Sequence, residues 1–183
     1  MRGERSDARR NRERLIREAR AMFAEGAAEL RLDELARRAG VGIGTLYRHF
    51  PDRSALIEAV YREEIASLGL AARDLSAAEA PLAALRAWML LFIDYIAAKR
   101  LIAPALDTAG GGRSTVLAEG NVAVIEAIDM LVARAVAAGE LRDTVEPLDL
   151  LRAIAGLAYL SNNPGWTDSA RRLIDILLAG SRP

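Results

Sequence analysis

The chain contains no cysteine and only one histidine, His49, among its 183 residues. Without cysteine there are no disulfides, no thiolate metal sites and no cysteine nucleophile, and one histidine cannot build a multi-histidine metal site. These absences fit a cytoplasmic protein and leave few groups for catalysis, so we expect no metal, no cofactor and no enzyme. No run of about 18 apolar residues is free of charge, so we expect no membrane partner.

Aromatic residues are also few, at 5%, whereas apolar residues make up 52% of the chain. Alanine is abundant, which favours helices over sheets, and the apolar content is sufficient for a sizeable core. Apolar residues recur at intervals of three and four almost everywhere, and no stretch shows the alternation typical of a β-strand. We therefore expect an all-α protein.

The charges sum to zero, from 25 basic and 25 acidic residues. A neutral total by itself argues against a nucleic-acid partner. However, residues 1–62 hold 14 arginines and 10 acids, whereas residues 63–183 hold 11 basic residues and 15 acids. Such an asymmetry between the two parts of a chain hints at a nucleic-acid-binding end.

The most specific pattern lies within residues 32–50. A short helix with an apolar stripe is expected to end at Gly40, whose backbone freedom suits a tight turn. A second short helix over 43–50 is stopped by Pro51. Together with an amphipathic helix over 7–24, this pattern predicts a three-helix unit whose second short helix can lie in a DNA major groove.

The next helix is expected to run from Arg53 to about Leu70, with Asp52 placed to cap it. In the second short helix, Leu46 and Phe50 are expected to point into the three-helix core. Its outer surface offers donors for phosphates, an arginine for phosphate or guanine and an apolar group for a thymine methyl. These outer residues are Ile43, Gly44, Thr45, Tyr47, Arg48 and His49. On the pattern alone, a plain helical hairpin with Tyr47 and His49 in the core is equally acceptable.

Residues 36–56 resemble, position by position, the DNA-binding signature of the TetR family of bacterial transcription regulators, and the resemblance extends from Arg12 to about Tyr61. The family implies a dimeric, ligand-responsive DNA-binding protein with about nine helices. The DNA-binding domain would occupy residues 1–52, with the helix over 53–70 as a connector. Residues 71–183 would form a ligand-binding and dimerisation domain.

The resemblance also implies roles for single residues. Tyr47 and His49 match phosphate-contacting positions, Thr45 matches a position that contacts phosphate or base, and Arg53 matches the basic residue that reaches the DNA backbone. Arg31 departs from the family pattern, because threonine or serine usually caps the second helix there. The lost cap typically costs about 1 kcal/mol, while the arginine adds a positive charge near DNA.

Two further features lie near this motif: a glycine at position 42 and a run of arginines at the N-terminal end. Gly42 replaces a frequent serine, which is a mild change because glycine tolerates the cap position. The arginine-rich leader is either a minor-groove arm or a frayed helix face with solvated charges. Its arginines are Arg2, Arg5, Arg9, Arg10, Arg12 and Arg14.

The second region is similar, at residues 81–88 and 139–151, to TetR proteins with an SbtR-like C-terminal domain, where the family holds its effector pocket and dimer interface. The helix over 82–99 is apolar nearly all round, so we expect it inside its domain. Its pocket-wall candidates, for which ordinary core packing is the alternative, are Trp88, Met89, Phe92, Asp94 and Tyr95. Asp94 could instead be a surface residue or pair with Arg134.

The last two helices, expected over 147–160 and 168–179, carry apolar stripes. Two such helices from each subunit would form a four-helix bundle, the family's usual dimer contact, although part of each stripe must serve the core. The candidate dimer residues are Leu151, Ile154, Leu157, Ala158, Leu173, Ile176 and Leu177. The two-fold symmetry of such a dimer matches a palindromic operator.

The resulting hypothesis is a transcription regulator, most often a repressor in this family, that binds a double-stranded DNA operator as a homodimer. An unknown small-molecule effector would release it. A helical enzyme with a buried pocket and an architectural DNA binder without an effector are the alternatives. The zero net charge then divides between a basic DNA-binding end and an acidic second region. DNA sequence specificity should therefore depend on residues 45–53 rather than on the overall charge.

Overall fold

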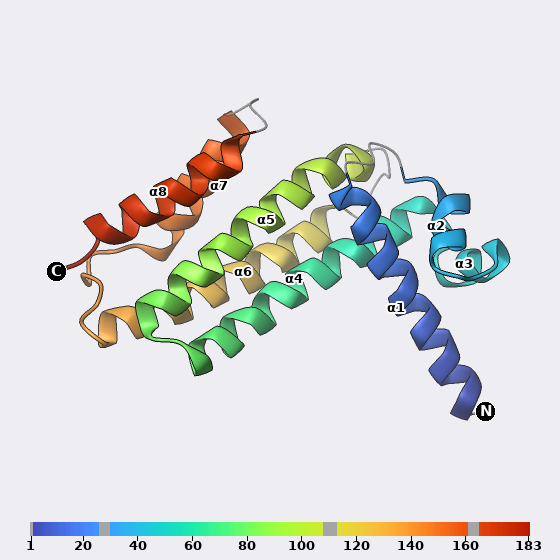
Figure 1. Ribbon diagram of the computed structural model, residues 1–183, viewed down its shortest axis with the longest axis horizontal. Coiled ribbons are helices and arrows are strands. Elements are labelled where there is room, and N and C mark those ends of the chain that lie inside the picture. The colour runs from blue at the N-terminus through green and yellow to red at the C-terminus, as the bar shows by residue number, and fades with distance from the viewer. Residues whose placement is uncertain (1, 26–29, 108–112, 161–164) are drawn as a thin grey trace. The chain divides into compact units, whose positions relative to one another are not determined.

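The computed structural model describes residues 2–25, 30–107, 113–160 and 165–183, and within these ranges it describes side chains except at 2–5, 24, 101–107 and 113–121. The described parts of the chain form eight helices and no strand, which confirms the expected all-α fold (Figure 1). The helices are α1 (Arg2–Ala24), α2 (Leu32–Arg38), α3 (Ile43–His49), α4 (Arg53–Ala78), α5 (Pro81–Asp107), α6 (Arg113–Ala137), α7 (Pro147–Leu160) and α8 (Trp166–Gly180).

The chain divides into two compact units. Unit 1 comprises residues 1–63 and 98–116, and unit 2 comprises residues 64–97 and 117–183. Helices α4, α5 and α6 therefore each contribute residues to both units.

Unit 1 has an apolar core that joins α1, α2, α3 and the beginning of α4. Each helix turns one stripe inward, as its spacing of three and four predicts, and leaves its charged side in solvent. The core side chains are Leu15, Ile16, Ala19, Met22, Phe23, Leu30, Leu35, Ala36, Ala39, Leu46, Phe50, Leu56, Ile57, Ala59 and Val60.

Two helices are longer than their apolar patterns predict. Helix α1 begins at Arg2 instead of Asp7, and α4 continues to Ala78 instead of ending near Leu70. Residues 71–78 contain four alanines, a leucine and an arginine. Such strong helix formers continue a helix even where no regular apolar stripe marks it.

The middle of α5 is the centre of unit 2. Trp88 and Met89 are completely buried there, and the indole Nε1 of Trp88 donates a hydrogen bond to the carbonyl of Leu68 at 3.0 Å. The Trp88 ring stacks on Phe92 with centroids 5.7 Å apart, and Phe92 lies 5.9 Å from Tyr95. The buried indole N–H thus has the acceptor that such a group requires.

One side of α5 faces solvent, so the expected all-round burial of this helix is only partly correct. Asp94 lies on this side, with its carboxylate 3.3 Å from Arg171 of α8. The suggested pair with Arg134 is wrong, because Arg134 of α6 donates to the carbonyl of Glu79 at 3.0 Å. Arg134 therefore satisfies a backbone acceptor just after the end of α4, where a cation is favoured.

Helices α7 and α8 lie side by side in unit 2 (Figure 1). Trp166, Ala170, Ile174 and Leu178 form the buried stripe of α8. A second ion pair joins α8 to α5, with the Arg86 Nε 2.6 Å from the Asp175 Oδ1. The hydrogen bond from Arg86 holds the pKa of Asp175 below its usual value.

The stretch 81–100 of α5 is long and apolar enough, by length and composition, to cross a membrane. The core helix of a globular domain meets the same two criteria. In this stretch Leu85, Trp88, Met89 and Ile93 are all completely buried within unit 2. The burial of these side chains is that of a core helix in a globular domain.

Candidate nucleic-acid interface

A tight turn joins α2 to α3. Gly40 adopts a φ of 66°, which is strained for any residue with a side chain, and its N–H donates to the carbonyl of Arg37 at 3.2 Å. The N–H of Val41 donates to the carbonyl of Ala36 at 3.0 Å, and the Val41 side chain packs against the core of unit 1. Glycine at 40 thus fixes the direction in which α3 leaves the turn.

Backbone hydrogen bonds close both ends of α3, and at the C-terminal end the N–H of Phe50 donates to the carbonyl of Leu46 at 2.8 Å. Gly42 is the N-cap residue, and its carbonyl accepts hydrogen bonds from the N–H groups of Thr45 and Leu46 at 2.8 and 3.1 Å. Beyond the helix, the Asp52 Oδ1 accepts from the N–H of Ala55 at 2.8 Å, which confirms the predicted cap of α4. Helix α3 is therefore a short rigid element held between two defined turns.

Helix α3 has one buried and one exposed side. Leu46 is completely buried and Phe50, directly after the helix, is 2% exposed, whereas Ile43 is 46% and Tyr47 is 50% exposed. His49 is half-buried, with its ring 6.4 Å from the ring of Phe50. Tyr47 is thus a surface residue, and the hairpin alternative that placed it in the core is wrong.

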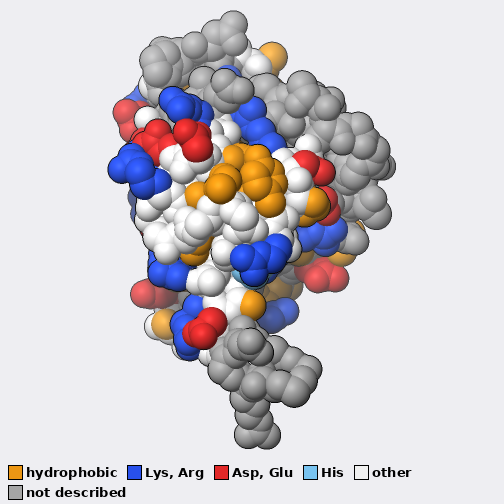
Figure 2. Space-filling model, turned by 90° about the vertical axis from the view of Figure 1, so that its right-hand side faces the viewer, with side chains coloured by type: hydrophobic (Ala, Val, Ile, Leu, Met, Phe, Trp, Pro, Cys, Tyr) orange, Lys and Arg blue, Asp and Glu red, His pale blue; other side chains and the backbone are white. Residues whose placement is uncertain are grey.

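Figure 2 looks onto the face that carries α3 and shows hydrophobic side chains in its middle, with blue basic and red acidic side chains around them. Ile43 and Tyr47 are the large hydrophobic side chains exposed in the described part of unit 1. Exposed groups of this kind, flanked by cations, can meet base edges while the cations meet phosphates.

Arg48 lies back along α3 toward the start of the helix. Its Nε donates to the carbonyl of Gly44 and its Nη2 donates to the hydroxyl of Thr45, both at 3.3 Å. A Cβ added at Gly44 would meet no atom within 4 Å. The first turn of α3 therefore presents an open backbone at Gly44 beside a hydroxyl and a guanidinium.

Arg31 occupies the N-cap position of α2 with extended backbone angles and makes no side-chain cap, as its residue type predicts. It pairs instead with Asp33, with its Nη2 3.0 Å from the Asp33 Oδ2, and both side chains are 68% exposed. This hydrogen bond holds the pKa of Asp33 below its usual value. The backbone donors of the first turn of α2 therefore lack the cap that threonine or serine would supply.

The substitution Arg31→Thr is expected to raise the free energy of unfolding by about 1 kcal/mol, because threonine at the N-cap accepts a hydrogen bond from the first turn of α2. Urea unfolding followed by circular dichroism measures this change. Arg37→Thr, an exposed site within the same helix, is the control and should give no gain. Equal effects of the two substitutions would contradict the capping argument.

The arginines of α1 and α2 differ in their contacts. Arg12 places its guanidinium over the ring of Phe50, with Cζ 5.4 Å from the centroid, which directs a cation to the end of α3. Arg38 of α2 pairs with Glu25 at 2.8 Å and with Glu34 at 3.3 Å, and the hydrogen bond that Arg38 donates to Glu25 raises the pKa of Arg38. Arg38 therefore braces α2, whereas Arg12 contributes charge beside the exposed face of α3.

The leader arginines lie at the start of α1. Arg9 pairs with Glu13 at 3.5 Å, and Arg10 pairs with Asp7. Both arginines are exposed and remain available to a DNA backbone. The side chains of Arg2 and Arg5 lie outside the described residues.

The nine predicted DNA-contact residues all belong to unit 1, in the α2–α3 segment and at the start of α4. Arg53, the first residue of α4, is half-buried there. In unit 2, the pocket candidates Trp88, Met89, Phe92 and Tyr95 are buried together, whereas Asp94 lies on the surface. The prediction that Asp94 belongs with these four side chains is therefore wrong, because its carboxylate lies at the surface and pairs with Arg171.

The candidate dimer residues also differ in their burial. Leu151, Ile154 and Ala158 are buried inside unit 2, Leu157, Leu173 and Leu177 are half-buried, and Ile176 is 66% exposed. Sequence reasoning missed two strongly exposed apolar residues near the end of α7. These are Tyr159 and Leu160, and their signal was their apolar character at the end of the helix predicted over 147–160.

Across the described residues, no cluster of three or more histidine, cysteine, aspartate or glutamate side chains could hold a metal ion.

Comparisons with known proteins match both parts of the chain. Residues 15–60 match the family of bacterial regulatory proteins, tetR family, and residues 80–183 match the transcriptional regulator SbtR-like C-terminal domain. A TetR transcriptional regulator from Streptomyces coelicolor, known from its crystal structure, is 40% identical, with a TM-score of 0.81. That match covers 94% of this chain and 98% of the other.

Two further proteins show how far the similarity reaches. An HTH-type transcriptional regulator of Staphylococcus aureus is 39% identical over 62 residues, and this match spans only 34% of that protein and 33% of this chain. A gamma-butyrolactone receptor (ArpA-like protein) shares the fold at 19% identity, with a TM-score of 0.64 and coverage of 96% of this chain and 90% of the other.

The exposed face of α3, the tight turn before it and the two matched segments agree with one another. The SbtR-like match covers more than half of the chain by itself. The chain belongs to the TetR family of bacterial DNA-binding transcription regulators and carries an SbtR-like C-terminal domain.

Proposed function

We propose that this regulator is a repressor that binds a palindromic operator as a homodimer and leaves it when unit 2 binds a small-molecule effector. The observation that carries the DNA-binding part is the surface of α3, with Tyr47 and Ile43 half-exposed beside the open backbone of Gly44. A helix of this kind enters a major groove with its first turn toward the base edges.

The proposed roles follow from the chemistry of each group. Tyr47 and His49 donate hydrogen bonds to phosphates, and Thr45 donates to a phosphate or a base. Ile43 contacts a thymine methyl, and Arg48 swings from its contacts with Gly44 and Thr45 to a phosphate or a guanine edge.

Three flanking residues complete the proposed DNA surface. Arg31 and Arg53 add phosphate contacts from the starts of α2 and α4. Gly42, whose added Cβ would also meet open space, allows the backbone to approach the DNA closely.

The proposed dimer surface lies on α7 and α8. Ile176 and Tyr159 are well exposed, at 66% and 64%, and Leu173 and Leu177 are half-buried near Ile176 on α8. Exposed apolar side chains on paired helices form the centre of typical homodimer interfaces. The buried candidates Leu151, Ile154 and Ala158 hold α7 in place beneath this surface.

Substitution of Ile176 by glutamate is expected to raise the dissociation constant of the dimer at least about tenfold, because it places an unpaired charge in an apolar contact. Sedimentation equilibrium measures the constant. Leu70→Glu is the matched control, because Leu70 is 57% exposed on α4 and lies outside this surface. If the dimer dissociation constant of Ile176→Glu equals that of the natural chain, α8 is not part of the dimer contact.

The proposed effector site is the aromatic cluster of α5, with Trp88, Met89, Phe92 and Tyr95. Small-molecule sites are lined mainly by hydrophobic and aromatic side chains with a few polar groups. Because these side chains are buried in the structure, an effector would bind a minor conformation in which the cluster opens. The gamma-butyrolactone receptor that shares this fold is named for its ligand. Effector binding would favour a dimer in which the two α3 helices no longer fit adjacent major grooves.

The test of this function is binding of the full chain to the DNA that flanks its own gene, followed by fluorescence anisotropy. We expect a sequence-specific complex that weakens as salt rises, because phosphate contacts release counterions. If neither specificity nor salt dependence is found, the proposed function is wrong. A cytoplasmic location follows from the same function, since the operator lies there in a bacterium.

A further inference from the structure

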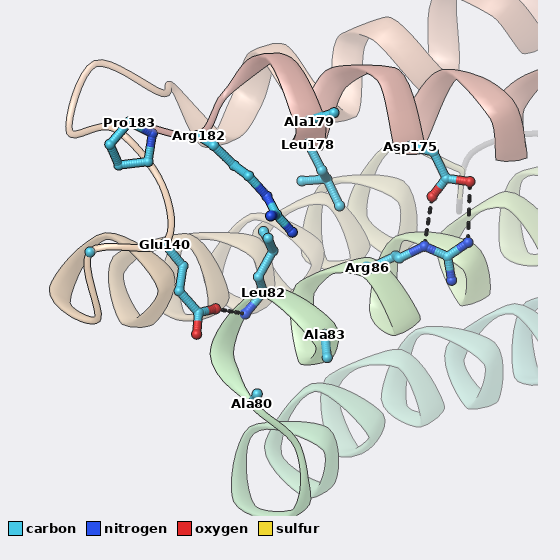
Figure 3. A pocket seen from close by; sticks show the side chains of 11 residues that line it. Ala80, Leu82, Ala83, Arg86, Glu140, Asp175, Leu178, Ala179, Arg182 and Pro183 are labelled. Carbon is cyan, nitrogen blue, oxygen red and sulfur yellow. Dashed lines mark hydrogen bonds and ion pairs between the residues drawn. The ribbon is translucent and has the colours of Figure 1, made fainter.

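A crevice of about 900 Å³ opens within unit 2 between the start of α5, the turn after α6 and the end of α8 (Figure 3). Its volume falls in the range of about 300–1,000 Å³ that is typical of small-molecule sites. None of the aromatic residues of α5 lines this crevice. It is therefore a different place from the proposed effector site.

Polar links hold the walls of the crevice together. The N–H of Leu82 at the start of α5 donates to the Glu140 Oε2 at 2.7 Å, and Arg86 forms two hydrogen bonds to Asp175 at 2.6 and 3.2 Å (Figure 3). The N–H of Arg142 donates to the carbonyl of Ser181 at 3.0 Å, which ties the end of α8 to the α6–α7 connection. The crevice is thus framed on three sides before any ligand enters.

The charged side chains that line the crevice differ in whether they already have partners. Glu140, Arg86 and Asp175 are engaged in the hydrogen bonds given above. Arg182 has no hydrogen bond or ion pair to any residue that the structure describes, and its side chain extends from the end of α8 into the crevice toward Leu82 (Figure 3). One positive charge is therefore left for an incoming group.

The remaining lining is apolar. Leu82 and Ala83 line the α5 side, and Leu178 and Ala179 line the α8 side. Glu140 and Asp175 lie at the same crevice and would repel a group with two negative charges, such as a phosphate monoester. A carboxylate carries one charge and matches the planar guanidinium with two parallel hydrogen bonds.

From this arrangement we propose that the crevice binds an amphipathic organic acid, whose carboxylate pairs with Arg182 and whose aliphatic body lies between Leu82 and Leu178. Such a ligand contacts three parts of unit 2 at once: the start of α5, the end of α8 and the turn that follows α6. Because it binds only the folded unit, it stabilises unit 2 against unfolding. The site goes beyond the proposed operator binding and depends on neither DNA nor the aromatic cluster of α5.

The test uses the full chain and three straight-chain acids, hexanoate, octanoate and decanoate, with octanol as the neutral probe and octylamine as the cationic probe. Isothermal titration calorimetry gives the affinities, and thermal unfolding gives the stabilisation. Three variants are compared with the natural chain. Arg182→Gln removes the free cation, Ala179→Trp fills the crevice, and Arg172→Gln is the control because Arg172 lies on α8 outside the crevice.

At least one acid is expected to bind saturably, and the neutral and cationic probes at least about tenfold more weakly, because a charge-assisted pair is lost. Arg182→Gln should weaken binding of the acid by a similar factor, Ala179→Trp should remove it, and Arg172→Gln should leave it unchanged. The proposal is overturned if none of the acids binds at millimolar concentration. It is equally overturned if an acid binds the Arg182→Gln and Ala179→Trp chains as well as the natural chain.

Discussion

Substitution of Gly44 by glutamate is expected to weaken operator binding on the order of a hundredfold while the protein remains folded. A side chain at this position meets open space in the free protein, so nothing in the fold opposes it. A carboxylate in the first turn of a helix also interacts favourably with the helix dipole. Bound to DNA, however, the same carboxylate would face phosphates, and an unfavourable pair of like charges costs several kcal/mol.

Two controls separate charge at the interface from other effects of Gly44→Glu. Gly44→Ala removes a flexible glycine from a helix, so it should increase stability by about 0.5–1 kcal/mol and weaken DNA binding less than glutamate does. Gly69→Glu places the same charge on α4, also where an added Cβ meets nothing within 4 Å, and should leave DNA binding unchanged. Anisotropy titrations of one operator duplex compare the three variants. If Gly44→Glu binds the operator duplex with the same affinity as the natural chain, DNA does not bind at α3.

Leu46→Ala is expected to lower the free energy of unfolding by about 2–5 kcal/mol, because it opens a cavity in the core of unit 1. Leu46 is completely buried between α1, α2 and α3 and is the residue that anchors α3 to them. The DNA affinity should fall as well, but for a different reason than in Gly44→Glu. In Leu46→Ala the exposed side chains of α3 are unchanged, but the packing that holds α3 against α1 and α2 is weakened.

Chemical unfolding monitored by circular dichroism measures the loss in Leu46→Ala. The matched control is Ile43→Ala on the exposed side of the same helix, which should change stability by no more than about 0.5 kcal/mol. Saturating operator should restore part of the stability of Leu46→Ala, since DNA binds only the folded unit. If the two substitutions destabilise the protein equally, α3 does not pack as the structure shows.

Local signals made the α2–α3 segment and the start of α4 predictable from the sequence, whereas the part of unit 1 at residues 98–116 was not predicted. Gly40 marked the turn because only glycine adopts its φ of 66° without strain, and Asp52 marked the start of α4 because its side chain reaches an N–H three residues later. The inward side of α3 followed from the spacing of Leu46 and Phe50. Each of these features depends on residues within a few positions of one another.

The features that the sequence did not reveal depend on residues far apart in the chain. The partner of Asp94 is Arg171, 77 positions away, and no periodicity distinguishes it from Arg134. The crevice of unit 2 likewise needs the start of α5 and the end of α8 to meet. Continuation of α4 past Leu70 was missed for another reason, because helix propensity acts there without an apolar stripe.

The measurement that tests DNA reading by α3 most directly is selection of bound duplexes from a random DNA pool by the full 183-residue chain. We expect enrichment of an inverted repeat whose half-sites lie about one helical turn apart, or a multiple of it, since two α3 helices related by a two-fold axis read it. The same selection with Gly44→Glu should enrich this repeat much less strongly. Enrichment of no sequence by the natural protein, or equal enrichment of the same sequence by both proteins, would contradict the proposed role of α3.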